Sequence, residues 1–225
     1  MPAKNTIKVY ADNSFYHIYN RGVNKQEIFV DSYDYYYFLY LLKKYLDPTF
    51  KKKFIDPVTG EALFVEGASF VGDVKLVAFA LMPNHYHLLL HNISKYGMEK
   101  LLRRVGTSYS LYFNNKYDRV GGVFQGVYKG VMITNQEHLL HLSCYIHLNP
   151  TELSDIHAKN LTGYDYSSYK YFLGEREGKW LHPNILLDMF YPNEEKAGAC
   201  YAKFVENHVK RFLEIRERVK SVVLD

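Results

Sequence analysis

Residues 74–92 read VKLVAFALMPNHYHLLLHN, and this stretch constrains the fold more than any other part of the chain. Two apolar runs are separated only by the turn signal MPN, which predicts two buried strands paired antiparallel. The second run carries His85 and His87 at alternate positions, so both imidazoles leave the same face of the strand. These histidines either pair with buried groups or hold a ligand.

Strand and helix signals alternate on both sides of this hairpin. The expected elements are a strand at 14–22, a helix at 31–46 with Asp31 as its N-cap, a helix at 98–117, a strand at 121–133 and a helix at 135–149. The resulting order is strand, helix, strand, strand, helix, strand, helix. It predicts an α+β, ferredoxin-like fold (split β-α-β), with an antiparallel sheet and helices on one face.

The chain divides into two parts by these signals. Residues 1–150 carry the predicted sheet, and residues 47–73, rich in Pro, Gly and mixed charge, indicate a long loop or an extra hairpin inserted in it. Residues 151–225 have only helical signals and predict a C-terminal helical extension.

Charge and composition narrow the class of protein only slightly. Lys and Arg outnumber Asp and Glu by 28 to 24, a mild surplus that permits a nucleic-acid partner without requiring one. The two cysteines have no metal-pair or disulfide pattern, and no secretion signal or membrane span is visible. We therefore expect a cytoplasmic protein with no membrane partner. The 22 tyrosines suit base stacking as well as ordinary packing.

A metal site needs more than the two histidines. Two imidazoles on one strand supply two neutral nitrogen ligands and leave room for a substrate oxygen. Tyr145 and Asn149 lie four residues apart on the last predicted helix and so share a face, where the Asn149 amide oxygen would be a third ligand beside the Tyr145 hydroxyl. Spacing alone favours Tyr145 as a core tyrosine and Asn149 as a helix-terminal residue before Pro150. Tyr109 and Tyr112 are weaker rivals, because their spacing suits core packing.

A tyrosine beside a histidine-held cation can attack a phosphate diester. The tyrosine hydroxyl has a pKa of about 10 and needs activation before it can attack. A bound cation offsets the charge that develops on the phosphate oxygens. Attack forms a phosphotyrosine and frees a sugar hydroxyl, so later rejoining needs no nucleoside triphosphate. In agreement, the chain has no Walker loop, because Asp73 stands where GASFVGDV would need lysine.

At this point a family resemblance becomes visible. ALMPNHYHLLL and YIHLNP resemble the two signature blocks of the single-tyrosine HUH transposases. YHIYNRG, GGVFQGVYKG and YDYSSYKYFLG most resemble the REP-associated tyrosine transposase branch. The resemblance covers about residues 12–205.

This resemblance implies a role for each matching residue. It implies His85, His87 and Asn149 as ligands of Mg²⁺ or Mn²⁺ and Tyr145 as the nucleophile. Single-stranded DNA, often a hairpin, is the implied substrate. Residues expected to contact this DNA are Arg21, Arg103, Arg104 and Lys129, and His141 is a positional candidate for the proton acceptor. Where the family usually has a basic residue, this chain has Val127, so Lys129 would have to replace it.

Three hypotheses follow for the function. The first is an enzyme that cleaves single-stranded DNA and transfers the strand through a 5′-phosphotyrosine at Tyr145. The second is a domesticated hairpin-DNA-binding protein without transposition activity, and the third is a metal-dependent phosphodiesterase that uses activated water. Family members act as monomers or as homodimers that exchange the tyrosine helix, and both arrangements stay open here.

Overall fold

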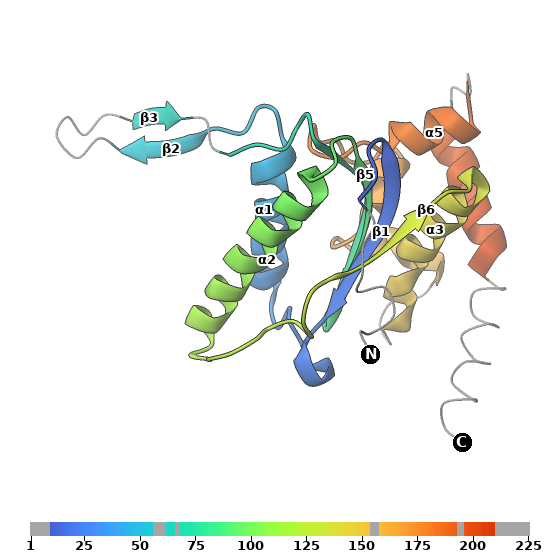
Figure 1. Cartoon of the computed structure of the whole chain (residues 1–225). Helices are drawn as coiled ribbons and strands as arrows, with labels where there is room; N and C mark the ends of the chain where they lie inside the picture. Colours follow the sequence, from blue (N-terminus) through green and yellow to red (C-terminus); the bar gives the residue numbers. More distant parts are fainter. Residues whose placement is uncertain (1–9, 56–61, 66–67, 154–157, 193–195, 210–225) are drawn as a thin grey trace.

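The computed structural model describes residues 10–55, 62–65, 68–153, 158–192 and 196–209. Its centre is a four-stranded antiparallel sheet with strand order β4-β5-β1-β6 (Figure 1). The strands are β1 (Ser14–Arg21), β4 (Val74–Met82), β5 (His85–Asn92) and β6 (Lys129–Ile133). β4 and β5 form the hairpin expected from the sequence, with Met82 opposite His85 at the turn. The predicted α+β fold and its order of strands and helices are confirmed.

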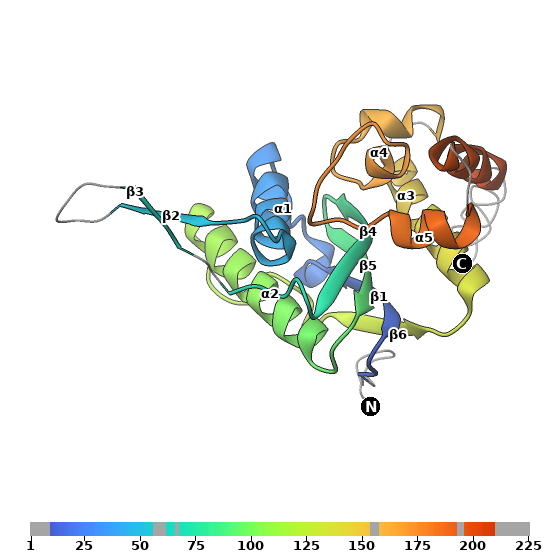
Figure 2. The ribbon, with the colours of Figure 1, turned by 90° about the horizontal axis from the view of Figure 1, so that it is seen from above.

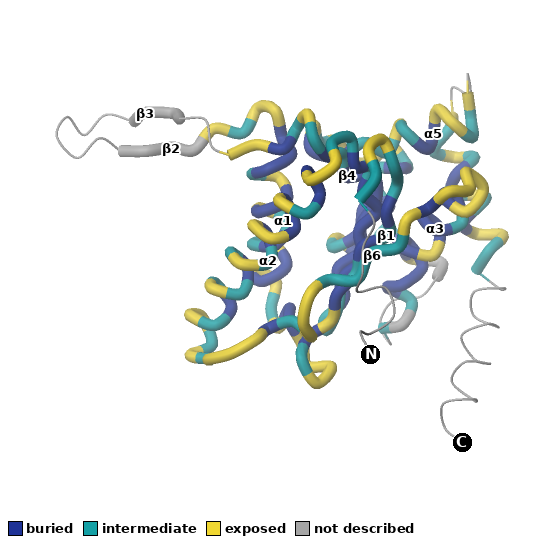
Figure 3. The backbone as a smooth tube through the Cα atoms, in the orientation of Figure 1, coloured by how far each residue is buried: buried dark blue, intermediate teal, exposed yellow. Residues whose placement is uncertain are grey.

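Alternate residues of the central strands face opposite sides of the sheet, because strand side chains have a period of two. Tyr16, Ile18 and Leu88 are buried in one hydrophobic core, while Leu89 belongs to a second core on the other side. β4 and β5 are buried along most of their length, and the helices are buried chiefly on the sides that face the sheet (Figure 3).

The first core lies under two long helices, α1 (Ser32–Leu46) and α2 (Gly97–Lys116), which cover one face of the sheet side by side (Figure 2). Asp31 caps α1 as expected, because its side chain accepts a hydrogen bond from the Asp34 backbone N–H and the Asp34 side chain bonds back in a capping box.

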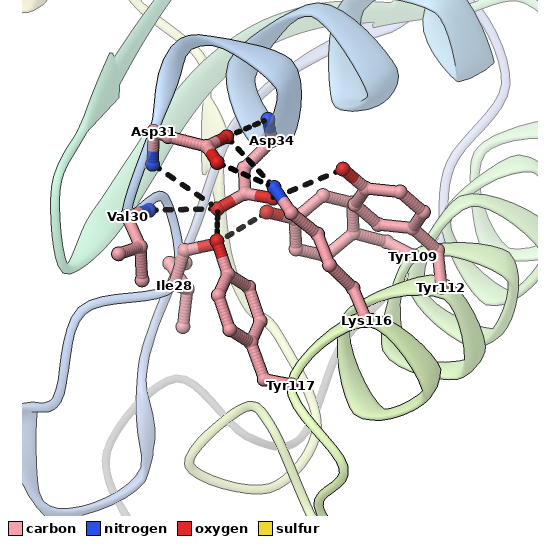
Figure 4. A network of polar contacts seen from close by, with 8 residues as sticks. All are labelled: Ile28, Val30, Asp31, Asp34, Tyr109, Tyr112, Lys116 and Tyr117. Carbon is pink, nitrogen blue, oxygen red and sulfur yellow. Dashed lines mark hydrogen bonds and ion pairs between the residues drawn. The ribbon is translucent and has the colours of Figure 1, made fainter.

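A polar network joins the beginning of α1 to the end of α2 (Figure 4). The Asp34 carboxylate is fully buried and accepts hydrogen bonds from Lys116 Nζ at 2.7 Å and from the Tyr117 hydroxyl at 2.8 Å. The Val30 backbone N–H and the Tyr112 hydroxyl also donate to it, at 2.8 Å and 3.0 Å. This buried charge is therefore compensated from both helices.

The opposite face of the sheet is also covered, which corrects the expectation of helices on one face only (Figure 2). The helices on this side are α3 (Gln136–Leu148), the 3₁₀ segments η2 (Asn149–Glu152) and η3 (Ala158–Gly163), the short α4 (Tyr169–Phe172) and α5 (Asn184–Phe190), and a helix over residues 197–209. Most of them contribute to the second core. The described residues after 150 contain helices, as predicted, whereas residues 210–225 of the expected extension lie outside the described part, and the domain boundary at 150 stays a prediction.

A buried histidine fixes α3 to its surroundings. The His147 ring is fully buried, and its Nδ1 and Nε2 atoms each lie 2.7 Å from a hydroxyl, those of Tyr201 and Ser168. Ser168 also accepts a hydrogen bond from the backbone N–H of Phe79 in β4. His147 thus connects α3 with the sheet and with the helix over 197–209.

Two further segments can be compared with the sequence-based expectations. Strand β6 differs from its prediction in length, and the 47–73 segment contains the hairpin that was one of its two expected forms. Strand β6 is shorter than the predicted strand at 121–133, because Gly121 and Gly126 have φ values of +94° and +75°, which break extended backbone. The expected insertion at 47–73 contains a two-stranded hairpin, β2 (Lys52–Ile55) with β3 (Ala62–Val65), which projects away from the sheet (Figure 1). No helix in the described part of the chain is long and apolar enough to cross a membrane.

Candidate active site

The two histidines of β5 lie on the face of the sheet that α3 covers. The ring centroids of His85 and His87 are 5.1 Å apart, and the rings are almost perpendicular, at 89°. His87 is buried, with 6% of its surface exposed, and is paired across the sheet with Tyr19 of β1. The strand period predicted from the sequence therefore does bring both imidazoles to one face.

A third histidine, His17 of β1, joins this pair. Its Nε2 lies 2.8 Å from Nδ1 of His87, so the two rings share one hydrogen bond. If Nδ1 of His87 carries the proton, Nε2 of His87 stays available for a metal, which is the usual arrangement around a ligating histidine. Sequence reasoning missed His17, although the alternation of YHIYNR places it on the same face as Tyr19.

Burial keeps these imidazoles neutral. Burial lowers the pKa of His17 to about 4, with a smaller contribution from His138. Burial, followed by the neighbouring His17 and His85, holds the pKa of His87 well below its ordinary value. A neutral imidazole has a lone pair for a cation, so this environment suits metal binding.

His85 is held from two sides. Its Nδ1 lies 2.6 Å from the side-chain oxygen of Asn84 in the β4–β5 turn. Burial and then Arg21 lower the pKa of His85 to about 4, against a smaller opposing effect of a hydrogen bond to Asn149. Asn149 is buried, and its amide N–H donates to the Tyr145 carbonyl at 2.8 Å. That bond fixes the amide so that its oxygen is the atom left for a cation beside His85.

Tyr145 approaches the histidines from α3. Its ring centroid is 5.6 Å from that of His87 and 6.2 Å from that of His17, and both pairs are edge-to-face. It is 40% exposed, which distinguishes it from a core tyrosine. A pocket of about 560 Å³ is lined by His17, Tyr19, His87, His138, His141 and Tyr145, among others. The Tyr145 phenol therefore shares one open pocket with the imidazoles of His17 and His87, whereas His85 lines a separate pocket.

The candidate proton acceptor lines the same pocket. His141 lies one turn before Tyr145 on α3, and its Nε2 is 3.8 Å from a carboxylate oxygen of Glu137. Its ring also contacts the helix over 197–209, with centroids 5.4 Å from Phe204 and 4.9 Å from His208. His141 is thus at the site, held between α3 and the C-terminal helix.

The expected DNA contacts fall into two groups. Arg21 and Lys129 line a second pocket, of about 420 Å³, together with His85 and Gln125. Arg103 and Arg104 are exposed on α2, on the other side of the sheet, and are not brought to the histidines. Val127 is 62% exposed in the loop before β6, and Lys129, the first residue of β6, is a cation beside His85.

The rival tyrosines lie far from this pocket in the fold. Tyr109 is fully buried in the core under α1 and α2, and its hydroxyl donates to the Ile28 carbonyl. The Tyr112 hydroxyl donates to Asp34 at 3.0 Å. Both hydroxyls are committed to structure on the opposite side of the sheet.

The donor set fits a divalent cation. Within the residues that the structure describes, no three His, Cys, Asp or Glu side chains are placed to hold a metal ion. The predicted set is of another kind, because it would combine the imidazoles of His85 and His87 with the buried amide oxygen of Asn149. Mixed nitrogen and oxygen donors beside an open pocket leave positions for substrate oxygens.

Comparison with known proteins supports the fold and shows the family. A solved structure of a REP-associated tyrosine transposase bound to a REP hairpin is similar in fold, with a TM-score of 0.51 over 79% of this chain and 90% of that chain, at 12% sequence identity. The model of the family described as "Transposase IS200 like" matches residues 31–149, more than half of the chain. The protein therefore belongs to the IS200-like transposases, a family of enzymes. No protein of curated function matches its sequence.

Proposed function

We propose that this protein cleaves single-stranded DNA and transfers the strand through a covalent 5′-phosphotyrosine at Tyr145, with a divalent cation, Mg²⁺ or Mn²⁺, held by His85, His87 and Asn149. The convergence of α3 and β5 supports this most directly, since it places the Tyr145 ring 5.6 Å from that of His87 in one open pocket. Family membership supports the reaction class.

The proposed step balances as a transesterification. The Tyr145 oxygen forms a bond to phosphorus, the bond from phosphorus to the sugar O3′ breaks, and a 3′-hydroxyl is released. The bound cation would offset the charge on the phosphate oxygens. His141, which lines the pocket, is the proposed acceptor of the tyrosine proton. Attack of a 3′-hydroxyl on the phosphotyrosine reverses the step and rejoins DNA.

The substrate is proposed to be single-stranded DNA next to a hairpin or repeat. Arg21 and Lys129 line the pocket that His85 shares, so their charges are placed for phosphates on either side of the scissile bond. The similar solved structure is described as bound to a REP hairpin, which supports a hairpin as the probe to try first.

The experiment incubates the protein with a hairpin carrying single-stranded flanks and Mn²⁺, and looks for a denaturation-resistant protein–DNA adduct. The adduct is expected with the wild type and not with Tyr145→Phe. Tyr40→Phe is the matched control, because Tyr40 is 44% exposed against 40% for Tyr145 and lies on α1. It should form the adduct as the wild type does.

The remaining outcomes identify the alternatives. Cleavage without an adduct would indicate a phosphodiesterase that uses activated water. Tight hairpin binding without cleavage would indicate a DNA-binding protein that lacks the chemistry. His85→Ala and His87→Ala should abolish cleavage and keep most of the DNA affinity, which depends mainly on phosphate contacts. Cleavage at the normal rate by either variant would refute the metal assignment.

A further inference from the structure

A third pocket lies between α2 and residues 121–128, and we call it the α2 groove. It has a volume of about 610 Å³, within the range of about 300–1,000 Å³ for pockets that hold small organic groups. The residues that matter here are Tyr10, Asn20, Arg103, Gly106, Phe124 and Tyr128, all of which line it. Nothing in the proposed cleavage reaction uses these residues.

Gly106 in the middle of α2 is the first observation. Glycine inside a helix is destabilising relative to alanine, so an interior glycine usually has a packing reason. Here a Cβ at Gly106 would meet no heavy atom within 4 Å beyond its own neighbours and helix backbone. Nothing within the described residues therefore requires a glycine. Because Gly106 lines the groove, the missing side chain leaves that part of the groove open.

The walls of the groove have the chemistry of a base-binding site. Tyr10, Phe124 and Tyr128 supply half-buried aromatic rings, and the Tyr10 and Tyr128 hydroxyls are 2.8 Å apart. Aromatic rings bind unpaired bases by stacking, without sequence preference. Arg103 brings an exposed positive charge that can reach a phosphate. Arg104, its neighbour, does not line the groove.

The groove adjoins the pocket of His85, because the two share one lining residue. Asn20 lines both the groove and the pocket of His85, and its amide N–H donates to the Gly126 carbonyl at 3.2 Å. Gln125 in the loop before β6 and Lys129 at the start of β6 line the pocket of His85, whereas Gly126 and Tyr128 of the loop line the groove. A strand that crosses this loop would contact both.

We propose that the α2 groove takes an unpaired nucleobase of the DNA strand next to the scissile phosphate, and that Gly106 keeps it open. This inference rests on the proposed function, because the nucleobase is assigned to the DNA strand whose scissile phosphate would lie at His85. The proposal also assigns a phosphate contact to Arg103, which lies on the other side of the sheet from the histidines.

The test measures binding in the Tyr145→Phe background, so that the DNA is not cleaved. The probes are a single-stranded dC homopolymer and an abasic homopolymer of the same length. Gly106→Leu should raise the Tm by about 2–4 °C through helix propensity. It should weaken dC binding about tenfold, the loss of about one stacked base, and leave abasic binding unchanged. Ser108→Leu, on the same helix but not lining the groove, is the control and should leave both affinities unchanged.

Charge is tested with the neighbouring arginines. Arg103→Ala should weaken binding of both probes several-fold and reduce the salt dependence by about one ion, and Arg104→Ala should change little. Equal effects of the two arginines, or an unchanged ratio of dC to abasic affinity in Gly106→Leu, would overturn the groove assignment. A change in oligomeric state without a change in DNA binding would also overturn it, because the groove would then be an interface between copies of the chain.

The adduct assay with Tyr145 intact separates the two proposals. Adduct formation together with an unaltered affinity ratio in Gly106→Leu refutes the groove and leaves the cleavage reaction standing. No adduct, together with a base preference that depends on Gly106, refutes the cleavage reaction and supports the groove as a DNA-binding site.

Discussion

Replacing Asp34 by asparagine tests whether the network between α1 and α2 carries much of the stability of this protein (Figure 4). The change keeps the shape of the side chain and removes its charge. The carboxylate accepts from two backbone N–H groups, two tyrosine hydroxyls and Lys116 Nζ. An asparagine has one acceptor oxygen, and its NH₂ would face donors. Breaking a buried, compensated charge in this way costs about 3–5 kcal/mol.

Asp31→Asn is the control within the same network. Asp31 also contacts Lys116, at 2.7 Å, but its side chain is 44% exposed, so this ion pair contributes at most about 1 kcal/mol. Asparagine caps a helix as well as aspartate does, so the hydrogen bond to the Asp34 backbone N–H is kept. Urea denaturation followed by circular dichroism should show Asp34→Asn losing several-fold more free energy of unfolding than Asp31→Asn.

The pH dependence of the free energy of unfolding tests the Asp34 carboxylate in a second way. Burial acts to raise the pKa of Asp34, but hydrogen bonds from Lys116, Tyr117 and the backbone outweigh it and hold the pKa below its ordinary value of 3.8. Because the folded-state pKa is the lower one, the stabilisation is present above the unfolded pKa and is lost as the pH falls through the folded pKa. The difference between wild type and Asp34→Asn should be constant near neutral pH and shrink below about pH 4. Equal stability of the two proteins at pH 7 would refute the reasoning.

Three more changes have defined outcomes. Gly22→Ala places a Cβ 2.1 Å from the Gln26 carbonyl oxygen, so it should cost about 1–3 kcal/mol in urea denaturation, and wild-type stability would contradict the close approach. His17→Ala removes the partner of His87 Nδ1 and should weaken Mn²⁺ binding about 10- to 100-fold by calorimetry, whereas unchanged affinity would show that the partner is dispensable. Tyr201→Phe removes a hydroxyl from the buried network of α3 and should cost about 1–3 kcal/mol, which unchanged thermal unfolding would contradict.

The order of elements could be predicted because local signals were strong. The apolar runs on either side of MPN, and Asp31 before a helical pattern, specify a hairpin and a helix start with little help from the rest of the fold. The beginning of β6 was harder to predict, because the alternation in GGVFQGVYKGVMI runs through glycines whose positive φ only the structure shows. The face on which α3 packs depends on contacts across the sheet, which no local pattern encodes.

For the candidate site, sequence spacing and resemblance predicted the members on β5 and α3. Spacing alone favoured a core role for Tyr145, whereas its 40% exposure beside His87 favours the proposed site role. His17 was missed because a single histidine in an aromatic strand resembles ordinary packing until its partner 70 positions away is known. Its hydrogen bond to His87 is a long-range fact, set by the pairing of β1 with β5.

Because side chains alternate along β1 and β5, neighbouring residues of one strand lie on opposite faces of the sheet and serve different purposes. Ile18 and Leu88 face the core under α1 and α2, whereas His17 and His87 face the pocket of Tyr145. Substitutions of Ile18 or Leu88 should register as changes in folding free energy, and those of His17 or His87 as changes in activity, although Leu89 on the second side belongs to a hydrophobic core as well. Adjacent residues of one β-strand, such as His17 and Ile18, could therefore be varied almost independently. The pocket of Tyr145 could then be redesigned without changing the core under α1 and α2.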